Sequence, residues 1–204
     1  MTDRYQTVLL FGAPGAGKGT QGELLGNIPG FFHMSTGDMF RTIDRQSELG
    51  RVFAEYSSRG ELVPDEVTIE TWRKYVHAQT VLGLFKPHAD LLILDGIPRT
   101  AAQTEIMNQY IEVRGIIHLV ATDSEEMVSR LQKRAIEQKR VDDAKIEVIR
   151  NRLEVYERET RPVLDQFDPS IIHEVDAIGS PAQVLSEVLS KLAPIQVAAS
   201  QPVS

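Results

Sequence analysis

The segment GAPGAGKGT at residues 12–20 constrains the fold more than any other part of the sequence. It follows the apolar run Thr7–Phe11, which is typical of a buried strand, and it opens a stretch with helical character. Its glycines let backbone N–H groups wrap phosphate oxygens, and the helix start and Lys18 add positive charge. The segment therefore predicts a phosphate-binding loop (P-loop) made by Gly15, Ala16, Gly17, Lys18, Gly19 and Thr20.

The alternative is a glycine-rich turn that carries a lysine by coincidence. The fixed spacing of Gly12, Gly17 and Lys18 between a strand and a helix argues against coincidence. In one respect the loop departs from the general pattern, because Gly19 follows the lysine and the hydroxyl comes one residue later, at Thr20. We therefore expect Thr20 to contact Mg²⁺ through water.

Short apolar runs alternate with longer amphipathic segments along the chain. The runs predict buried strands at Thr7–Phe11, Phe31–Met34, Leu91–Leu94, Ile116–Ala121 and Ile171–Val175. Helices are predicted at Thr20–Leu25, Asp38–Arg45, Pro64–Ala78, Ala101–Arg114, Glu125–Arg134, Ile146–Phe167 and Pro181–Leu192. The alternation predicts an α/β protein whose parallel sheet is covered by helices on both faces.

Two segments interrupt this alternation as insertions. Residues 35–67 are helical and punctuated by Gly50 and Gly60, and residues 130–143 form a short basic stretch. We expect both to form flaps over a core of residues 1–34, 68–129 and 144–193. The last segment, 194–204, is small and polar with two prolines and is predicted to be a flexible tail.

Composition and charge exclude several classes of function. A formal net charge of -7 argues against a general nucleic-acid binder, because affinity for the phosphate backbone comes from clustered lysine and arginine. The N-terminal apolar run is too short for a signal peptide or a membrane span, so we expect no membrane association. The chain has no cysteine, which rules out thiolate zinc ligands and fits a reducing compartment, so we expect the cytoplasm and no structural zinc.

Five segments occur in an order that one known family shares. They are GAPGAGKGTQ from residue 12, HMSTGDMFR at 33–41, GELVPDE at 60–66, DGIPRT at 95–100 with Gln103, and the stretch from Arg130 to Arg152. Along nearly its whole length the chain resembles the adenylate kinases, which are nucleoside monophosphate kinases. The resemblance implies a three-layer fold like that of the P-loop nucleoside triphosphate hydrolases, with a five-stranded parallel sheet. It also implies that 35–67 binds the monophosphate, that 130–143 is a short lid, and that a monomer converts ATP and AMP to two ADP with Mg²⁺.

The resemblance assigns the AMP contacts to one set of residues. A planar guanidinium can grip a phosphate through two hydrogen bonds, which suits Arg41 and Arg99 to the AMP phosphate. An amide offers a donor and an acceptor, so Gln103 can match the N1 and N6 edge of adenine. The full set is Thr36, Arg41, Glu61, Val63, Gly96, Arg99, Gln103, Arg140 and Arg152. The competing interpretation is that these residues cap helices and solvate the surface.

The stretch from Arg130 to Arg152 holds eight basic residues against four acidic ones, within a chain that is acidic overall. By resemblance, Arg130 stacks on the ATP adenine, Gly179 also contacts ATP, and Arg134, Arg140 and Arg152 surround the phosphates. Asp142 and Asp143 resemble the paired aspartates of the lid hinge. The remaining basic residues suit an ordinary solvated face, and Arg150 stays open as an alternative to Arg152.

For catalysis the resemblance implies a set of fixed positive charges and one metal ion. The set is Lys18, Arg41, Arg99, Arg134, Arg140 and Arg152. Asp95 follows an apolar strand, where α/β sheets bind ligands, and we expect it and Thr20 to hold Mg²⁺ through water.

Two other functions compete with this one. A kinase for UMP, CMP or GMP would share the fold, but UMP/CMP kinases typically carry alanine where Thr36 stands and asparagine where Gln103 stands. A nucleotide-binding module without turnover would need no arginines on both sides of the transferred group.

Overall fold

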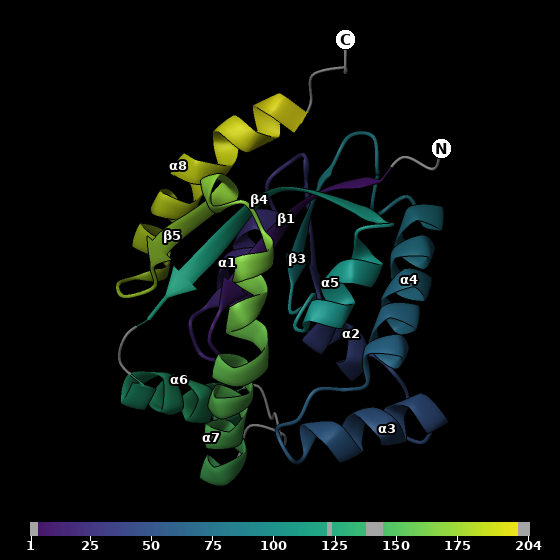
Figure 1. Ribbon diagram of the computed structural model, residues 1–204, viewed down its shortest axis with the longest axis vertical. Coiled ribbons are helices and arrows are strands. Elements are labelled where there is room, and N and C mark those ends of the chain that lie inside the picture. Colours follow the sequence, from purple (N-terminus) through teal and green to yellow (C-terminus); the bar gives the residue numbers. More distant parts are fainter. Residues whose placement is uncertain (1–3, 122–123, 138–144, 200–204) are drawn as a thin grey trace.

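The computed structural model describes residues 4–121, 124–137 and 145–199 (Figure 1). Its centre is a parallel sheet of five strands in the order β2-β3-β1-β4-β5. The strands are β1 (Tyr5–Gly12), β2 (Phe31–Ser35), β3 (Leu91–Asp95), β4 (Ile111–Val120) and β5 (Ile172–Asp176). The predicted α/β class and the five-stranded parallel sheet are confirmed.

Consecutive residues of the central strands are buried on opposite faces of the sheet. Val8 and Leu10 pack against α1 (Lys18–Gly26) and α8 (Pro181–Ala199). Leu9 and Phe11 pack on the other side against α4 (Asp65–Val81) and α5 (Ala101–Met107). Because helices cover both faces, the central strands contain unbroken apolar runs, Val8–Phe11 in β1 and Leu91–Leu94 in β3, and this is why these short runs could be recognised.

The remaining helices gather beyond the carboxyl ends of the strands. Between β2 and α4 lie α2 (Thr36–Arg41) and α3 (Glu48–Ser57), and the side chains of Ser35 and Ser47 cap their first turns. After β4 come α6 (Ser124–Glu137) and α7 (Ile146–Val155). In Figure 1, α3, α6 and α7 lie at one end of the molecule. The division into core, insertion and lid stays a prediction, and the lid residues 138–143 lie outside the described part.

Three predicted helices extended too far, and the one predicted over Asp38–Arg45 ends at Arg41. The helix predicted over Ala101–Arg114 ends at Met107, because β4 begins at Ile111 and pairs there with Tyr5 of β1. The helix predicted over Ile146–Phe167 leaves the α conformation after Val155. It continues as a π-helical turn, η2 (Tyr156–Thr160), and a 3₁₀ helix, η3 (Arg161–Gln166), and a shorter 3₁₀ turn, η4 (Pro169–Ile171), follows. Pro162 lacks an N–H and cannot make the bond that a regular helix requires there.

The tail predicted from Pro194 onward is wrong for its first residues, because α8 runs through Pro194 to Ala199. Packing holds this last part. The Ile195 side chain lies over Gly115 of β4, where an added Cβ would come within 2.5 Å of its Cδ1 atom. Gln196 donates a hydrogen bond to the backbone carbonyl of Pro29 at 3.2 Å. These contacts stabilise the end of α8 by more than Pro194 destabilises it through the missing backbone hydrogen bond.

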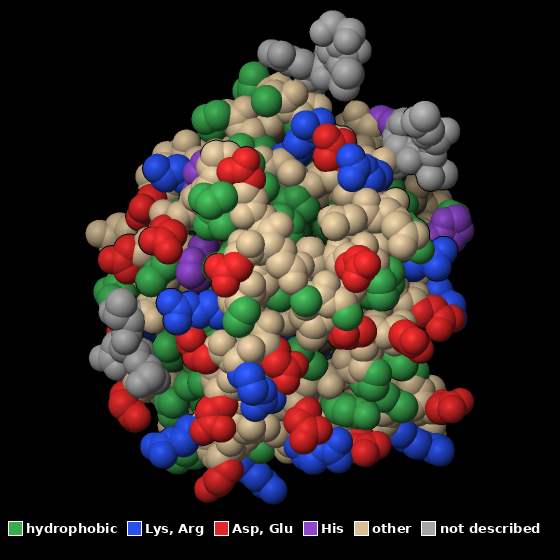
Figure 2. Space-filling model, in the orientation of Figure 1, with side chains coloured by type: hydrophobic (Ala, Val, Ile, Leu, Met, Phe, Trp, Pro, Cys, Tyr) green, Lys and Arg blue, Asp and Glu red, His purple; other side chains and the backbone are tan. Residues whose placement is uncertain are grey.

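Acidic and basic side chains are mixed over the face shown in Figure 2, without a single large basic area there. Among the described residues, no helix combines the length and the apolar character that crossing a membrane requires.

Anchoring of α8 can be tested with Ile195→Ala and the matched variant Val197→Ala. Ile195 is partly buried, so its truncation should lower the free energy of unfolding by about 1–3 kcal/mol. Val197 is 62% exposed, so its truncation should change that energy by less than about 0.5 kcal/mol. Urea denaturation measures both. Equal values for the two variants would mean that this end of the chain is frayed.

Candidate active site

One cleft of about 630 Å³ opens at the carboxyl edge of the sheet. Ligands of α/β proteins bind at this edge. The cleft is lined by every predicted binding or catalytic residue that the structure describes, namely Gly15, Ala16, Gly17, Lys18, Gly19, Thr20, Thr36, Arg41, Glu61, Val63, Asp95, Gly96, Arg99, Gln103, Arg130, Arg134, Arg152 and Gly179. Arg140, Asp142 and Asp143 lie outside the described residues.

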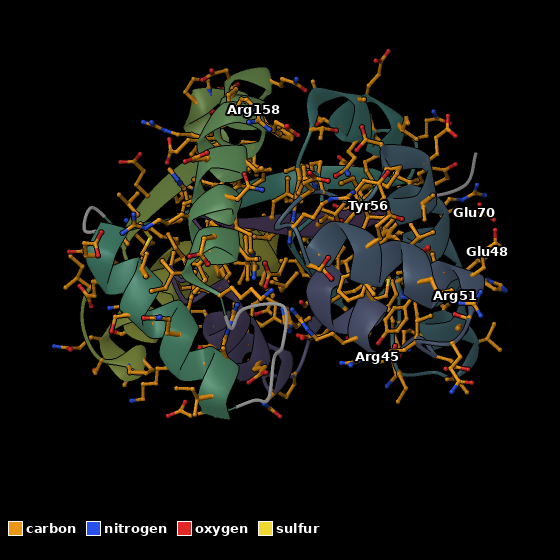
Figure 3. All side chains as sticks on the ribbon, turned by 90° about the horizontal axis from the view of Figure 1, so that it is seen from below. Arg45, Glu48, Arg51, Tyr56, Glu70 and Arg158 are labelled. Carbon is orange, nitrogen blue, oxygen red and sulfur yellow. The ribbon has the colours of Figure 1, made fainter. Side chains whose placement is uncertain are left out.

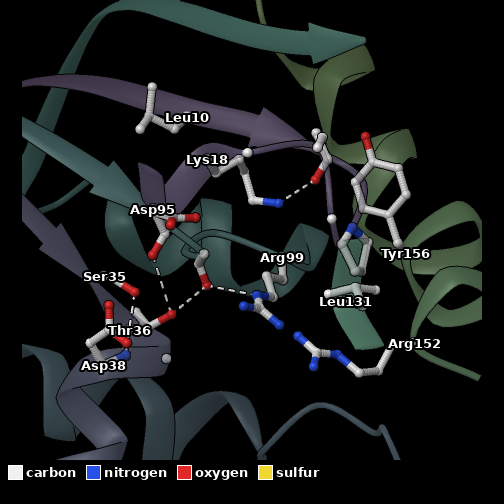
Figure 4. A pocket seen from close by; sticks show the side chains of 18 of the residues that line it. Leu10, Lys18, Ser35, Thr36, Asp38, Asp95, Arg99, Leu131, Arg152 and Tyr156 are labelled. Atoms are coloured by element: carbon white, nitrogen blue, oxygen red, sulfur yellow. Dashed lines mark hydrogen bonds between the residues drawn. The ribbon is translucent and has the colours of Figure 1, made fainter. Parts of the chain in front are cut away.

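The P-loop forms the floor of the cleft. Gly17 caps α1 with a φ of 94°, a left-handed conformation that suits glycine, and the helix starts at Lys18. The Lys18 ammonium donates to the carbonyl of Gly12 at 2.6 Å and to that of Ala13 at 3.1 Å, so the side chain folds back along the loop (Figure 4). Burial lowers the pKa of Lys18 to about 8, against the attraction of Asp95.

Asp95 stands at the end of β3, and only 8% of its surface is exposed. An added Cβ at Gly19 would lie 4.0 Å from its Oδ2 atom, which places the carboxylate beside the P-loop. Carboxylate, hydroxyl and phosphate oxygens are the ligands that Mg²⁺ prefers, and one or two carboxylates suffice when phosphates are also bound. Asp95 and Thr20 therefore fit a magnesium ion at this position.

A second group of positive charges faces the P-loop across the cleft. Arg41 closes α2, Arg99 follows β3, and Arg152 comes from α7. Figure 4 shows Arg99 and Arg152 pointing toward one another. Burial lowers the pKa of Arg99, Asp95 opposes this effect, and the positive charge of Arg41 adds to it. A cluster of positive charges of this kind favours the binding of an anion such as a phosphate group.

The structure bears on the choice between Arg150 and Arg152. The Arg150 side chain is 63% exposed and approaches Glu125 at 3.9 Å, away from the residues that line the cleft. Arg152 lines the cleft, and its charge lowers the pKa of Lys18. Of the two arginines, Arg152 is therefore the one that lies in the cleft.

The predicted base-binding side of the cleft is tightly packed. Gln103 is 2% exposed and Thr36 is 3% exposed, and the Thr36 hydroxyl donates to the Gly96 carbonyl at 2.9 Å. Gly96 has a φ of +84°, and an added Cβ would meet the Thr36 hydroxyl oxygen at 2.6 Å. A larger residue at position 96 is therefore excluded by both the backbone and the space.

The side toward α6 holds the predicted ATP residues. Arg130 donates to the Ala177 carbonyl at 3.2 Å and to Glu126 at 2.6 Å, which places its guanidinium beside the loop that contains Gly179. Arg134 comes from the next turn of α6 and lies close enough to Lys18 for its charge to lower the lysine pKa.

Sequence reasoning missed some residues that line the cleft, among them Phe53 and Tyr156. Tyr156 is 7% exposed, burial raises its pKa to about 12, and its hydroxyl lies 3.4 Å from His118 Nε2. Tyr156 follows Arg152 by four residues, and residues at this spacing share a helix face. The predicted role of Arg152 could therefore have indicated that Tyr156 also faces the cleft.

Two cationic groups that share one cleft above a P-loop place this chain among the P-loop kinases of small nucleotides. A family model described as adenylate kinase matches residues 10–172. The chain therefore belongs to the adenylate kinase family. An adenylate kinase from Kocuria rhizophila is 41% identical over 191 residues, covering 91% of this chain and 97% of the relative. Adenylate kinases from Flavobacterium psychrophilum and Thermus thermophilus are 37% and 35% identical and cover 91% and 93% of the chain, in each case with 98% of the relative.

The depressed pKa of Lys18 predicts how this amine responds to pH and to a nucleotide. Without a bound anion it should lose its proton near pH 8, well below the ordinary value of 10.5, because burial disfavours the charged form. Bound phosphates favour the charged form and should raise the pKa again. NMR titration of the lysine Cε signals, assigned by comparison with Lys18→Met, measures this. Titration near 10.5 in the free protein would contradict the burial argument.

Proposed function

We propose that this chain transfers the γ-phosphoryl group of Mg-ATP to AMP and back, giving two ADP. The observation that supports this proposal is the shared cleft, which Lys18, Arg41 and Arg99 all line. In this account the P-loop holds the triphosphate, and the arginines hold the monophosphate. Two phosphates held end to end have the geometry that direct transfer requires.

The reaction needs little covalent work from the protein. An oxygen of the AMP phosphate forms a bond to the γ-phosphorus of ATP, and the bond from that phosphorus to the β-γ bridging oxygen breaks, leaving its electron pair on ADP. The AMP phosphate is already anionic, so no general base is required. Lys18, Arg99 and Arg152 would neutralise the charge that spreads over the transferred group, as would Arg41, Arg134 and Arg140.

Asp95 and Thr20 are the residues that would hold Mg²⁺ through water. Magnesium supplies charge neutralisation at the phosphates when it is bound. Asp95 also attracts Lys18 and Arg99, since its charge raises the pKa of both side chains against the effect of burial. This carboxylate thus favours the charged form of both cations.

We further propose that Thr36, Gly96 and Gln103 hold the AMP base, with Glu61 and Val63 beside them, and that Arg130 and Gly179 hold the ATP base. A cytoplasmic monomer without nucleic-acid or membrane partners is the state that we propose for the enzyme.

One assay separates the proposal from its alternatives. ADP formation from Mg-ATP should be fast with AMP and slow with UMP, CMP or GMP. A preference for a pyrimidine monophosphate would make the chain a UMP/CMP kinase instead. ATP binding by calorimetry without any ADP formation from ATP and AMP would make it a binding module.

The role of Arg99 can be tested with Arg99→Ala. Loss of a charge that stabilises the transition state should cost about 3 kcal/mol, which is roughly a hundredfold in kcat/KM for AMP. Arg51→Ala is the matched control. Arg51 lies on the outer side of α3 (Figure 3) and is exposed outside the cleft, so its loss should change turnover less than about twofold. Near-normal turnover of Arg99→Ala would refute the assignment.

A further inference from the structure

The Gln103 side chain is held at both ends of its amide by the protein. The Arg99 backbone N–H donates to Gln103 Oε1 at 2.7 Å, and Gln103 Nε2 donates to Asp65 Oδ1 at 2.7 Å. Gln103 is buried yet lines the cleft. An amide has two hydrogens on nitrogen and two lone pairs on oxygen, so one of each is left for a ligand.

Asp65 is itself fixed in place. It is the first residue of α4, and its second oxygen accepts a hydrogen bond from the Thr100 hydroxyl at 2.9 Å. The same hydroxyl accepts from the Gln103 backbone N–H at 3.1 Å, which caps α5. The Asp65 carboxylate is therefore hydrogen-bonded to Thr100, the N-cap residue of the helix that carries Gln103.

This arrangement allows one orientation of the amide. A carboxylate can only accept hydrogen bonds, and a backbone N–H can only donate. If the amide turned over, Gln103 Oε1 would face the Asp65 oxygen and Nε2 would face the Arg99 N–H. Two acceptors and two donors would then oppose each other in a buried place, which is costly.

We propose that Asp65 is a positioning residue that fixes the Gln103 amide and thereby selects a 6-aminopurine monophosphate over a 6-oxopurine one. The inference rests on the proposed function, in which Gln103 contacts the base of AMP. Adenine presents an acceptor at N1 and a donor at N6, whereas hypoxanthine and guanine present a donor at N1 and an acceptor at O6. Donor and acceptor are thus exchanged between the two kinds of base. An amide that cannot turn over can match only one of the two patterns at a given base position.

The test is the selectivity between AMP and IMP, whose bases differ at this edge. In Asp65→Asn the new amide can donate as well as accept, so of the two contacts that oppose the turned-over Gln103 amide only the one with the Arg99 N–H remains. The ratio of kcat/KM for AMP to that for IMP should fall about tenfold. The change should lie mainly in the KM for the monophosphate, while the KM for ATP stays the same. Asp65→Ser, whose hydroxyl can also donate or accept, should act in the same direction and serves if the first variant does not fold.

Glu66→Gln is the matched control. Glu66 is exposed in the same first turn of α4, and the variant removes one negative charge from the same helix start. Its AMP to IMP ratio should equal that of the parent chain. An unchanged ratio in a folded Asp65 variant, or an equal loss for both monophosphates, would overturn the inference. A parent chain that does not phosphorylate AMP at all would instead refute the proposed function.

Discussion

The mutual repulsion of buried positive charges at the carboxyl edge of the sheet is the constraint on which the site depends. Burial lowers the pKa of Lys18 and of Arg99, and neighbouring arginines lower each further. A protein gains nothing from such a cluster unless anions compensate it. Asp95 compensates part of the charge in the free protein. Asp38 also pairs with Arg41, at 3.2 Å, and bound phosphate groups would add further negative charge to the cluster.

The sheet order explains how the charges come together. Strands β2, β3 and β1 are neighbours, and Asp95 pairs in register with Leu10 of β1 and with Ser35 of β2. The three strands therefore end within two residues of the same level. From these ends the chain continues into the P-loop, the segment that contains Thr36, and the segment that contains Arg99. Parallel pairing thus places residues far apart in the sequence around one cleft.

Much of this could be predicted from the sequence, because its signals are local. The apolar runs mark strands covered on both faces, and the glycine spacing marks the P-loop. What could not be predicted depends on distant contacts. The early end of α5 is set by the pairing of Ile111 with Tyr5, and the persistence of α8 past Pro194 is set by packing of Ile195 on Gly115. Asp65 lies in the segment GELVPDE, but its hydrogen bond to Gln103 could not be predicted, since it joins two helices that are distant in the sequence.

The site residues themselves were identified by family resemblance, and the structure adds where they lie. It brings Arg152 into the cleft and leaves Arg150 on the surface, a distinction that spacing alone left open. Arg140 lies outside the described residues, so its part in the site stays a prediction.

The central claim is that two phosphate chains meet end to end between Lys18 and the arginine pair Arg41 and Arg99. A crystal structure with a bisubstrate dinucleotide, in which a polyphosphate joins two adenosines, tests it most directly. The account predicts one ligand per chain, with phosphates running from the P-loop to Arg41 and Arg99 and with one base beside Gln103. Phosphates that stop at the P-loop, with both arginine side chains turned away from them, would contradict it.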